Sequence, residues 1–210
     1  MKNIFYYLCL SFFILACEDI QEQNELESNF YALTVGNSWV YRNYRYNSTS
    51  DTYTDSGIVD SVSIVGAEKI NENIFYKFRR LTTGNDNNNQ IFKKNGEYFE
   101  FLRDSSGVLV NELGQIIHTS IDYQERLLRE NDWGDLYEKL SIETEELHLE
   151  SGTFNCVVTE RYAKSKEGEK YPSTDYIYYS DGFGFIYETI SFISSDTLTA
   201  LRRLDSYEIN

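Results

Sequence analysis

The sequence predicts a mainly β protein made of a single curved antiparallel sheet or open barrel, with at most one or two short helices. Apolar and polar residues alternate with a period of two along most of the chain after residue 30, a pattern typical of half-buried strands. The chain has one proline among 210 residues, and short polar connections separate the alternating runs. Short connections favour antiparallel pairing, because parallel strands need long crossover segments.

The first predicted strands follow one another closely. We expect them over Ser38–Tyr46, Gly57–Ala67 and Ile74–Leu81, and the polar segment Glu68–Asn73 is short enough to join the last two as a hairpin. In Gly57–Ala67 one face is apolar except for Asp60, its members being Ile58, Val62 and Ile64.

A second hairpin is predicted over Gln90–Arg103. The dipeptide Asn95-Gly96 lies between two alternating runs, and it supplies the two residues with positive φ that a type I′ turn requires. The polar segment Thr83–Asn89 then forms the loop between the two hairpins.

The remainder of the chain predicts further strands and one short helix. The helix is expected over Ile121–Glu130, with Ser120 as its N-cap and Gly134 beyond its end. The strands are expected over Val108–Ile117, Leu140–Leu149, Thr153–Tyr162, Tyr176–Tyr179, Gly184–Phe192 and Thr197–Tyr207.

The first 16 residues have the pattern of a signal peptide. Lys2 precedes an apolar run that is too short for the ~20 residues of a membrane-spanning helix. The run ends in Ile14-Leu15-Ala16-Cys17, which resembles the lipobox of bacterial lipoproteins. The resemblance implies cleavage between Ala16 and Cys17 and attachment of fatty acyl chains, such as palmitate, at Cys17. An ordinary secretory signal with a chance cysteine, or an N-terminal membrane anchor, is the alternative.

The predicted mature chain contains an acidic tether and one β domain. Cleavage removes Lys2 but no acid, so the net charge becomes one unit more negative than −15. Residues 17–29 are predicted to form a flexible tether, and residues 30–210 are predicted to form the domain. The acids after Cys17 partly resemble the surface-export signals of Bacteroidetes lipoproteins, which implies an outer-membrane anchor on the cell surface or the periplasmic face. Cys156 is then the only unmodified cysteine, and we expect it to be a buried hydrophobic residue in a strand.

Three blocks resemble bacterial envelope lipoproteins of Bacteroidetes type that have no assigned activity. The blocks are Leu33-Thr34-Val35-Gly36-Asn37-Ser38-Trp39-Val40-Tyr41, Gly152-Thr153-Phe154 and Tyr178-Tyr179-Ser180-Asp181-Gly182-Phe183-Gly184. The resemblance implies a long curved sheet similar to the folds of periplasmic lipoprotein carriers, and it brings no catalytic residue to this chain. Phe183 and Ser180-Asp181 depart from the usual pattern, in which valine and a small residue are common.

The sequence contains no recognisable catalytic, metal or cofactor motif. Its 34 acidic residues against 19 basic ones exclude a protein that coats nucleic acid, which needs clustered Lys and Arg. The two histidines, His118 and His148, are far apart, and neither belongs to a metal-binding or nucleophile motif. We therefore expect no enzymatic activity, no metal and no cofactor.

Some shorter patterns leave alternatives open. Asp51, Asp55 and the loop around Asp86 offer oxygen ligands for calcium but lack the spacing of a known calcium loop, so polar turns are favoured. The triplets that contain Ser61 and Thr197 resemble the O-glycosylation acceptor of Bacteroidetes envelope proteins.

The aromatic content is the remaining clue to function. With 18 Tyr, 13 Phe and 2 Trp, the aromatic side chains could line a concave face that holds an acyl chain or a glycan, or could simply fill pleated surfaces. The expected function is a lipid-anchored, non-enzymatic scaffold or binding protein whose envelope protein, lipid or glycan partner is open. A carrier of a hydrophobic or glycan ligand is the alternative, and a hydrolase is the less favoured one.

Overall fold

A computed structural model describes residues 29–210, so that the predicted signal peptide, Cys17 and most of the tether lie outside the described residues. All strands in this part of the chain belong to one antiparallel sheet in the order β6-β5-β4-β3-β2-β1-β12-β11-β10-β9-β8-β7. The strands are β1 (Ser38–Asn47), β2 (Thr52–Ile70), β3 (Asn73–Thr83), β4 (Gly96–Asp104), β5 (Val108–Asn111), β6 (Ile116–Thr119), β7 (Arg126–Asn131), β8 (Gly134–Leu149), β9 (Gly152–Lys164), β10 (Lys170–Ser180), β11 (Gly184–Ser191) and β12 (Leu198–Glu208).

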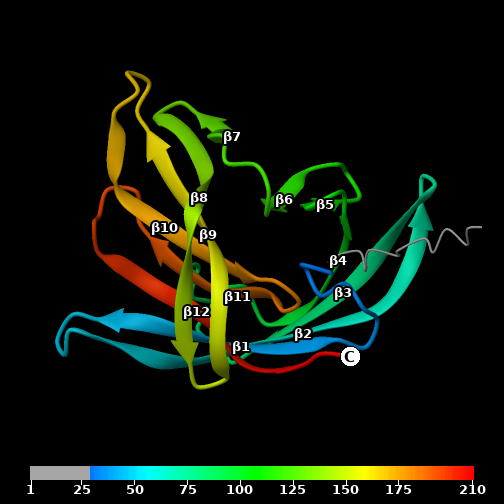
Figure 1. Ribbon diagram of the computed structural model, residues 1–210. Coiled ribbons are helices and arrows are strands. Elements are labelled where there is room, and N and C mark those ends of the chain that lie inside the picture. The colour runs from blue at the N-terminus through cyan, green and yellow to red at the C-terminus, as the bar shows by residue number, and fades with distance from the viewer. Residues whose placement is uncertain (1–28) are drawn as a thin grey trace, which may run out of the picture.

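The predicted fold class is confirmed. The sheet twists so strongly that β8 and β9 cross in front of β1 and β2 (Figure 1). The edge strands β6 and β7 follow each other in sequence but do not pair, so the sheet is not closed into a barrel. Within residues 29–210 no segment forms a helix.

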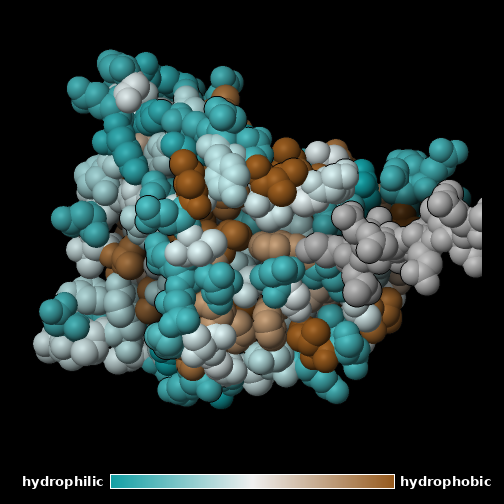
Figure 2. All heavy atoms as spheres, viewed as in Figure 1, coloured by the Kyte–Doolittle hydropathy of each residue, from teal (hydrophilic) through white to brown (hydrophobic). Residues whose placement is uncertain are grey.

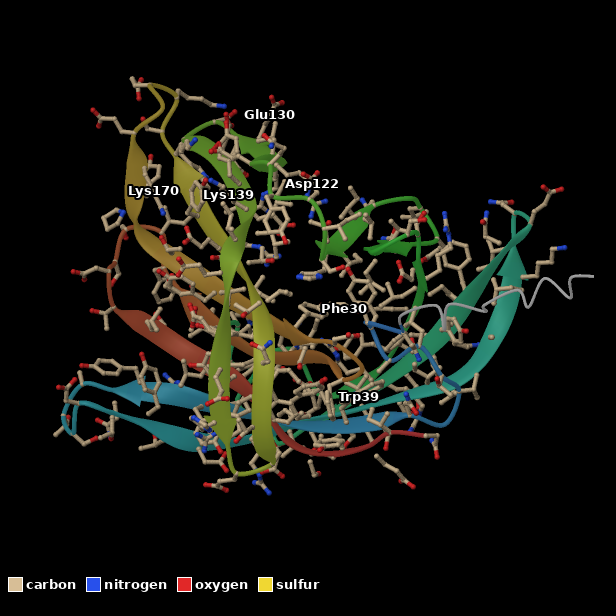
Figure 3. The ribbon with its side chains drawn as sticks, in the orientation of Figure 1. Phe30, Trp39, Asp122, Glu130, Lys139 and Lys170 are labelled. Carbon is tan, nitrogen blue, oxygen red and sulfur yellow. The ribbon has the colours of Figure 1, made fainter. Side chains whose placement is uncertain are left out.

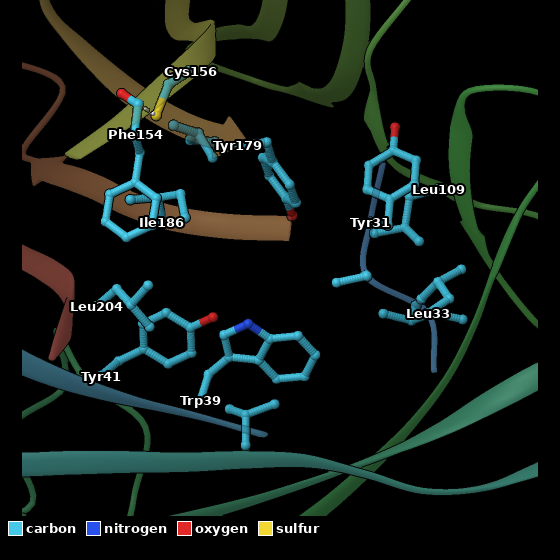
Figure 4. Close-up of a cluster of buried hydrophobic side chains, with 14 of the residues drawn as sticks. Tyr31, Leu33, Trp39, Tyr41, Leu109, Phe154, Cys156, Tyr179, Ile186 and Leu204 are labelled. Atoms are coloured by element: carbon cyan, nitrogen blue, oxygen red, sulfur yellow. Dashed lines mark hydrogen bonds between the residues drawn. The ribbon is translucent and has the colours of Figure 1, made fainter. Parts of the chain in front are cut away.

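The main core lies inside the curve of the sheet. Buried side chains from both halves meet there, among them Trp39, Tyr41, Ile186 and Leu204 (Figure 4). Hydrophobic side chains also gather in the middle of the face shown in Figure 2, and hydrophilic ones cover its ends.

The segment that precedes β1 enters this core. Tyr31, Ala32 and Leu33 are buried there, although they belong to no strand. The amide of Asn37 donates to the carbonyl of Ala32 at 2.8 Å, and the Asn37 side chain accepts a bond from the backbone of Asn210 at 2.9 Å. The start and the end of the described chain are therefore held together.

The predicted helix over Ile121–Glu130 is wrong. Its second half is β7, which pairs with β8, and its first half is a short link after β6. Ser120, the expected N-cap, donates to the carbonyl of Gly107 at 3.0 Å, while the hydroxyl of Thr119 accepts from the backbone of Asp122. Local side-chain bonds and strand pairing satisfy the backbone that a helix would have satisfied.

The predicted Asn95-Gly96 hairpin turn is also wrong. Strand β4 begins at Gly96, and residues 84–95 form a long loop instead of a strand and a turn. The side chain of Asn95 accepts from the backbone of Asn85 at 2.7 Å and donates to Asp86 at 2.8 Å. Phe92 is drawn into a second small core with Ile58 and Ala200, which removes its segment from the sheet.

The first predicted hairpin exists, but its turn is tighter than expected. Strands β2 and β3 pair as far as Ile70 and Asn73, so most of the expected connection is strand. Asn71 and Glu72 form the turn, both with positive φ. Ile58, Val62 and Ile64 are all buried, as the alternation predicts.

Candidate functional site

A cavity of about 220 Å³ opens on the concave face of the sheet. Its lining comes from both halves of the sheet and from the segment before β1. The lining residues are Tyr31, Leu33, Trp39, Tyr41, Val62, Phe78, Arg80, Tyr98, Glu100, Leu102, Leu109, Ile117, His118, Glu138, Thr159, Arg161, Ile177, Tyr179, Gly184, Phe185, Glu188 and Arg202. The cavity therefore combines aromatic walls with charged groups.

The aromatic walls are fixed by hydrogen bonds to one turn. Trp39 donates from Nε1 to the carbonyl of Phe183 at 2.9 Å, and the Tyr41 hydroxyl donates to the carbonyl of Phe185 at 3.0 Å. Both acceptors flank Gly184, whose φ is +77° and where a Cβ would lie 3.1 Å from the Tyr31 carbonyl oxygen. The Gly-Phe-Gly block thus brings β11 close to the segment before β1.

Arg202 carries the positive charge on one side of the cavity. It approaches Asp60 at 3.9 Å and Glu188 at 3.3 Å, and its guanidinium lies 4.4 Å from the ring centre of Phe185. Burial opposes its charged form, yet Glu188 and Asp60 raise the pKa of Arg202 above its ordinary value. Asp60, the polar exception on the face of β2, also accepts the hydroxyl of Thr82 at 2.5 Å.

Glu138 is the centre of a second ion cluster. Its carboxylate is 4 % exposed and is bound by Arg126 and by Arg161, the latter at 3.1 Å. Arg126 also donates to the carbonyl of Ile116 on β6 at 3.2 Å. The cluster thus connects β8 and β9 to both unpaired edges of the sheet.

His118 brings a buried ring to the cavity. Tyr31 donates its hydroxyl proton to the carbonyl of Gly107 at 2.8 Å, and the same oxygen lies 3.2 Å from Nδ1 of His118. From these distances we assign the proton of the ring to Nδ1, which leaves Nε2 as an acceptor. Burial, with the charges of Arg126 and Arg161, lowers the pKa of His118 to about 3, so the ring is neutral at physiological pH.

Several buried polar atoms around the cavity have no hydrogen-bonding partner among residues 29–210. They include Nε2 of His118, Oγ1 of Thr159 and Nε of Arg161. His118 and Thr159 are each 2 % exposed. Nε of Arg202 is similar, because its contact with Glu188 lacks hydrogen-bond geometry. Unpartnered buried polar groups are rare in proteins, and four of the seven among residues 29–210 belong to residues that line this cavity.

Asp175 lies next to these clusters on β10. It lies opposite Arg161 in the register of β10 with β9. Its carboxylate accepts a hydrogen bond from the hydroxyl of Ser191 at 2.7 Å. Burial raises the pKa of Asp175 to about 6, against the opposing effects of Ser191 and Arg161.

Among residues 29–210, the predicted modification sites do not line the cavity, whereas His118 and several members of the three sequence blocks, such as Trp39 and Tyr179, do. Cys17 and Ala16 fall outside the described residues. Ser61 is exposed in the middle of β2, and Thr197 is exposed in the turn before β12. Cys156 is completely buried, as predicted, and burial raises the pKa of its thiol to about 12.

The candidate calcium residues are engaged in local bonds. Asp51 accepts the hydroxyl of Tyr46 at 2.7 Å, Asp55 pairs with Arg42 at 3.2 Å, and Asp86 accepts from Asn95. In the part of the chain that the structure describes, no three His, Cys, Asp or Glu side chains meet in a way that could hold a metal ion. No helix among residues 29–210 is long and apolar enough to cross a membrane.

Sequence reasoning found His118 as one of two histidines but missed its neighbours. His148 is exposed and contacts Glu146 at 3.1 Å, far from any such cluster. Glu138, Arg161 and Arg202 lie in strands that carry several other charged residues, and only the pairing of the strands brings these three to the cavity. The sequence signal that could have indicated this site was Asp60, the polar residue inside the apolar face of β2.

The fold and the cavity together define a class of protein: an open, curved antiparallel sheet with an aromatic and charged cavity on its concave face. No protein-family model matches the chain, and no curated protein matches it. Two solved structures are similar to it. One is described as a "putative lipoprotein" from Parabacteroides distasonis, and the other as a "putative exported protein with YmcC-like fold" from Bacteroides fragilis.

The two similarities are of equal extent. Each has a TM-score of 0.52 and covers 86 % of this chain and 99 % of the solved one. The sequence identities are 13 % for the Parabacteroides protein and 10 % for the Bacteroides protein. At this identity the likeness shows a shared fold.

Proposed function

We propose that the protein is a lipid-anchored, non-enzymatic binding protein of the bacterial envelope whose ligand occupies the cavity on the concave face. The proposal rests on one observation, the set of unpartnered buried polar atoms that surround the cavity. Leaving such atoms unpaired costs about 1–3 kcal/mol each, and a ligand whose polar groups reach them would recover this energy.

The cavity supports binding better than hydrolysis. Among residues 29–210, the hydroxyl hydrogen-bonded to His118 is that of Tyr31, whose proton goes to a carbonyl, so no activated nucleophile results. Both carboxylate oxygens of Glu138 are already engaged, one by Arg126 and the other by Arg161. A hydrolase would need a base that is free to take a proton.

The envelope location is supported by the lipobox-like sequence Ile14-Leu15-Ala16-Cys17 and by the exported and lipoprotein descriptions of the two structural neighbours. Either leaflet, and either the cell surface or the periplasmic face, is compatible with such an anchor. The acidic domain is then held near a membrane whose anionic lipids repel it.

The anchor is tested by replacing Cys17. We expect Cys17→Ala to accumulate as a larger, unlipidated precursor, and globomycin, which inhibits the lipoprotein signal peptidase, to make the unaltered protein accumulate as a larger precursor that is lipidated but still carries its signal peptide. Cys156→Ala is the matched control, because Cys156 is buried in β9 and its loss leaves the lipobox intact. Unchanged mobility and fractionation of Cys17→Ala would disprove the lipid anchor.

Ligand binding is tested by native mass spectrometry of the full-length protein released from lipid nanodiscs. We expect a mass above that of the lipidated chain, and Ile177→Trp, which extends a buried lining residue into the cavity, should remove it. Ile142→Trp is the control, because Ile142 is 81 % exposed. A bare protein in every preparation would contradict the binding function.

A further inference from the structure

We infer that the ligand of the cavity is a neutral, polyhydroxylated ring, such as one sugar residue of a glycan, whose hydroxyls bond to Thr159, Arg161 and His118. This inference rests on the proposed binding function and adds the chemical class of the ligand.

The unpartnered atoms need both donors and acceptors from one ligand. Nε2 of His118 accepts, Nε of Arg161 donates, and the hydroxyl of Thr159 can do either. A sugar hydroxyl also donates and accepts, so adjacent hydroxyls on one ring satisfy such a mixed set. An acyl chain would leave all three atoms unpaired and would forfeit that gain.

The charges around the cavity are balanced. Three arginines and three glutamates line it, namely Arg80, Arg161, Arg202, Glu100, Glu138 and Glu188. Arg161 is already paired with Glu138, and Arg202 with Glu188 and Asp60. At Arg161 and Arg202 an anionic ligand would compete with these carboxylates, whereas a neutral ligand bonds to the remaining donors without disturbing the two ion pairs.

The walls of the cavity, whose volume is about 220 Å³, suit a ring. Tyr31, Trp39, Tyr41 and Tyr179 converge on the interior in Figure 4. Aromatic side chains bind the C–H faces of a sugar while their polar tips stay hydrogen-bonded.

The inference is tested by saturation-transfer NMR on the full-length protein in lipid nanodiscs, with three kinds of probe. The probes are neutral sugars (glucose, galactose and N-acetylglucosamine), the anionic sugar galacturonate, and dodecanoate. We expect a neutral sugar to bind and the other two kinds to bind at least tenfold more weakly. The same nanodiscs without protein give the background signal of each probe.

Two variants locate the binding. Thr159→Val removes an unpartnered hydroxyl at nearly constant volume, so it should weaken binding of the sugar about tenfold without lowering the melting temperature. Arg161→Lys keeps the charge but removes Nε–H, and it should act in the same direction. Thr144→Val is the control, since Thr144 is exposed on β8 and lies outside the cavity.

Each of the other outcomes overturns either the ligand class, the assigned residues or the binding function itself. Binding of dodecanoate or galacturonate in place of the neutral sugars would overturn the ligand class and leave the binding function standing. Sugar binding that is unaffected by both variants would overturn the assignment of the three residues. If no probe binds and native mass spectrometry finds the protein bare, the cavity holds only water and both proposals fail.

Discussion

Two titratable residues beside the cavity have opposite effects on stability as the pH changes. The folded-state pKa of His118 is lowered to about 3, so the unfolded chain binds a proton first and stability falls as the pH drops below about 6.5. The folded-state pKa of Asp175 is raised to about 6, so the folded protein binds the proton first. Its charged form therefore costs stability above pH 6, and this cost disappears as the pH falls towards about 4.

Replacing Asp175 with a neutral residue should show how much its buried charge lowers the free energy of unfolding. We expect Asp175→Asn to raise the free energy of unfolding by up to about 3 kcal/mol at pH 7.5, because the shift of about two pKa units no longer has to be overcome. The gain should shrink through pH 6 and vanish near pH 4. Asparagine keeps an oxygen that can accept the Ser191 hydroxyl. Urea unfolding across this pH range measures the difference.

Asp135 provides the matched control. A hydrogen bond from Lys166 lowers the pKa of Asp135, so Asp135→Asn should decrease stability at pH 7.5 or leave it unchanged. A gain from Asp175→Asn that is the same at pH 7.5 and pH 4 would show that burial of its charge is not the cause.

At the scale of the elements, the strands were predictable where alternation is regular on one face. Strand β1 matches the predicted segment Ser38–Tyr46 to within a residue, and β8 to β12 each contain most of the segment expected for them. In these strands the period of two reports directly which side faces the core, and no local signal competes with it.

The single strand predicted over Val108–Ile117 is in fact the hairpin of β5 and β6. The wrong helix and the wrong Asn95-Gly96 turn share a physical cause, because long-range packing overrode a local preference. The Asn95-Gly96 dipeptide has the composition of a tight turn, but burial of Phe92 against Ile58 holds residues 84–95 away from the sheet. The helical pattern of residues 121–130 yields to pairing of Leu127 with Tyr137 on β8. Neither partner can be identified from the sequence around these segments.

The cavity could be foreseen only in part for the same reason. Aromatic content left open whether rings line a concave face or only fill pleated surfaces, and Trp39, Tyr41 and Tyr179 line the cavity. The ion clusters depend on register, because Arg202 and Asp60 meet only once β12, β1 and β2 are paired. In Figure 3, Trp39 lies in the interior of the curve, whereas Glu130 and Lys170 lie near its rim.

At the scale of the whole molecule, the segment before β1 holds the two halves of the open sheet together. Tyr31 donates to Gly107, next to β5, and packs edge-on against His118 of β6 and Tyr179 of β10. The ring of His118 stacks on that of Tyr179 with 3.9 Å between their centres. Because β6 and β7 do not pair, these contacts replace the hydrogen bonds that would close a barrel.

Removing Tyr31 should therefore loosen one arm of the sheet before the rest. We expect Tyr31→Ala to lower the free energy of unfolding by about 3–5 kcal/mol, as for other large buried rings, and Tyr31→Phe by about 1 kcal/mol. Amide hydrogen exchange should accelerate in β5 and β6, which have few partners, and stay slow in the long ladder between β2 and β3. Tyr123→Ala is the control, because Tyr123 is 43 % exposed in the link after β6. Equal acceleration in β2 and β5 would mean that the sheet unfolds as one unit and that Tyr31 does not join two separable halves.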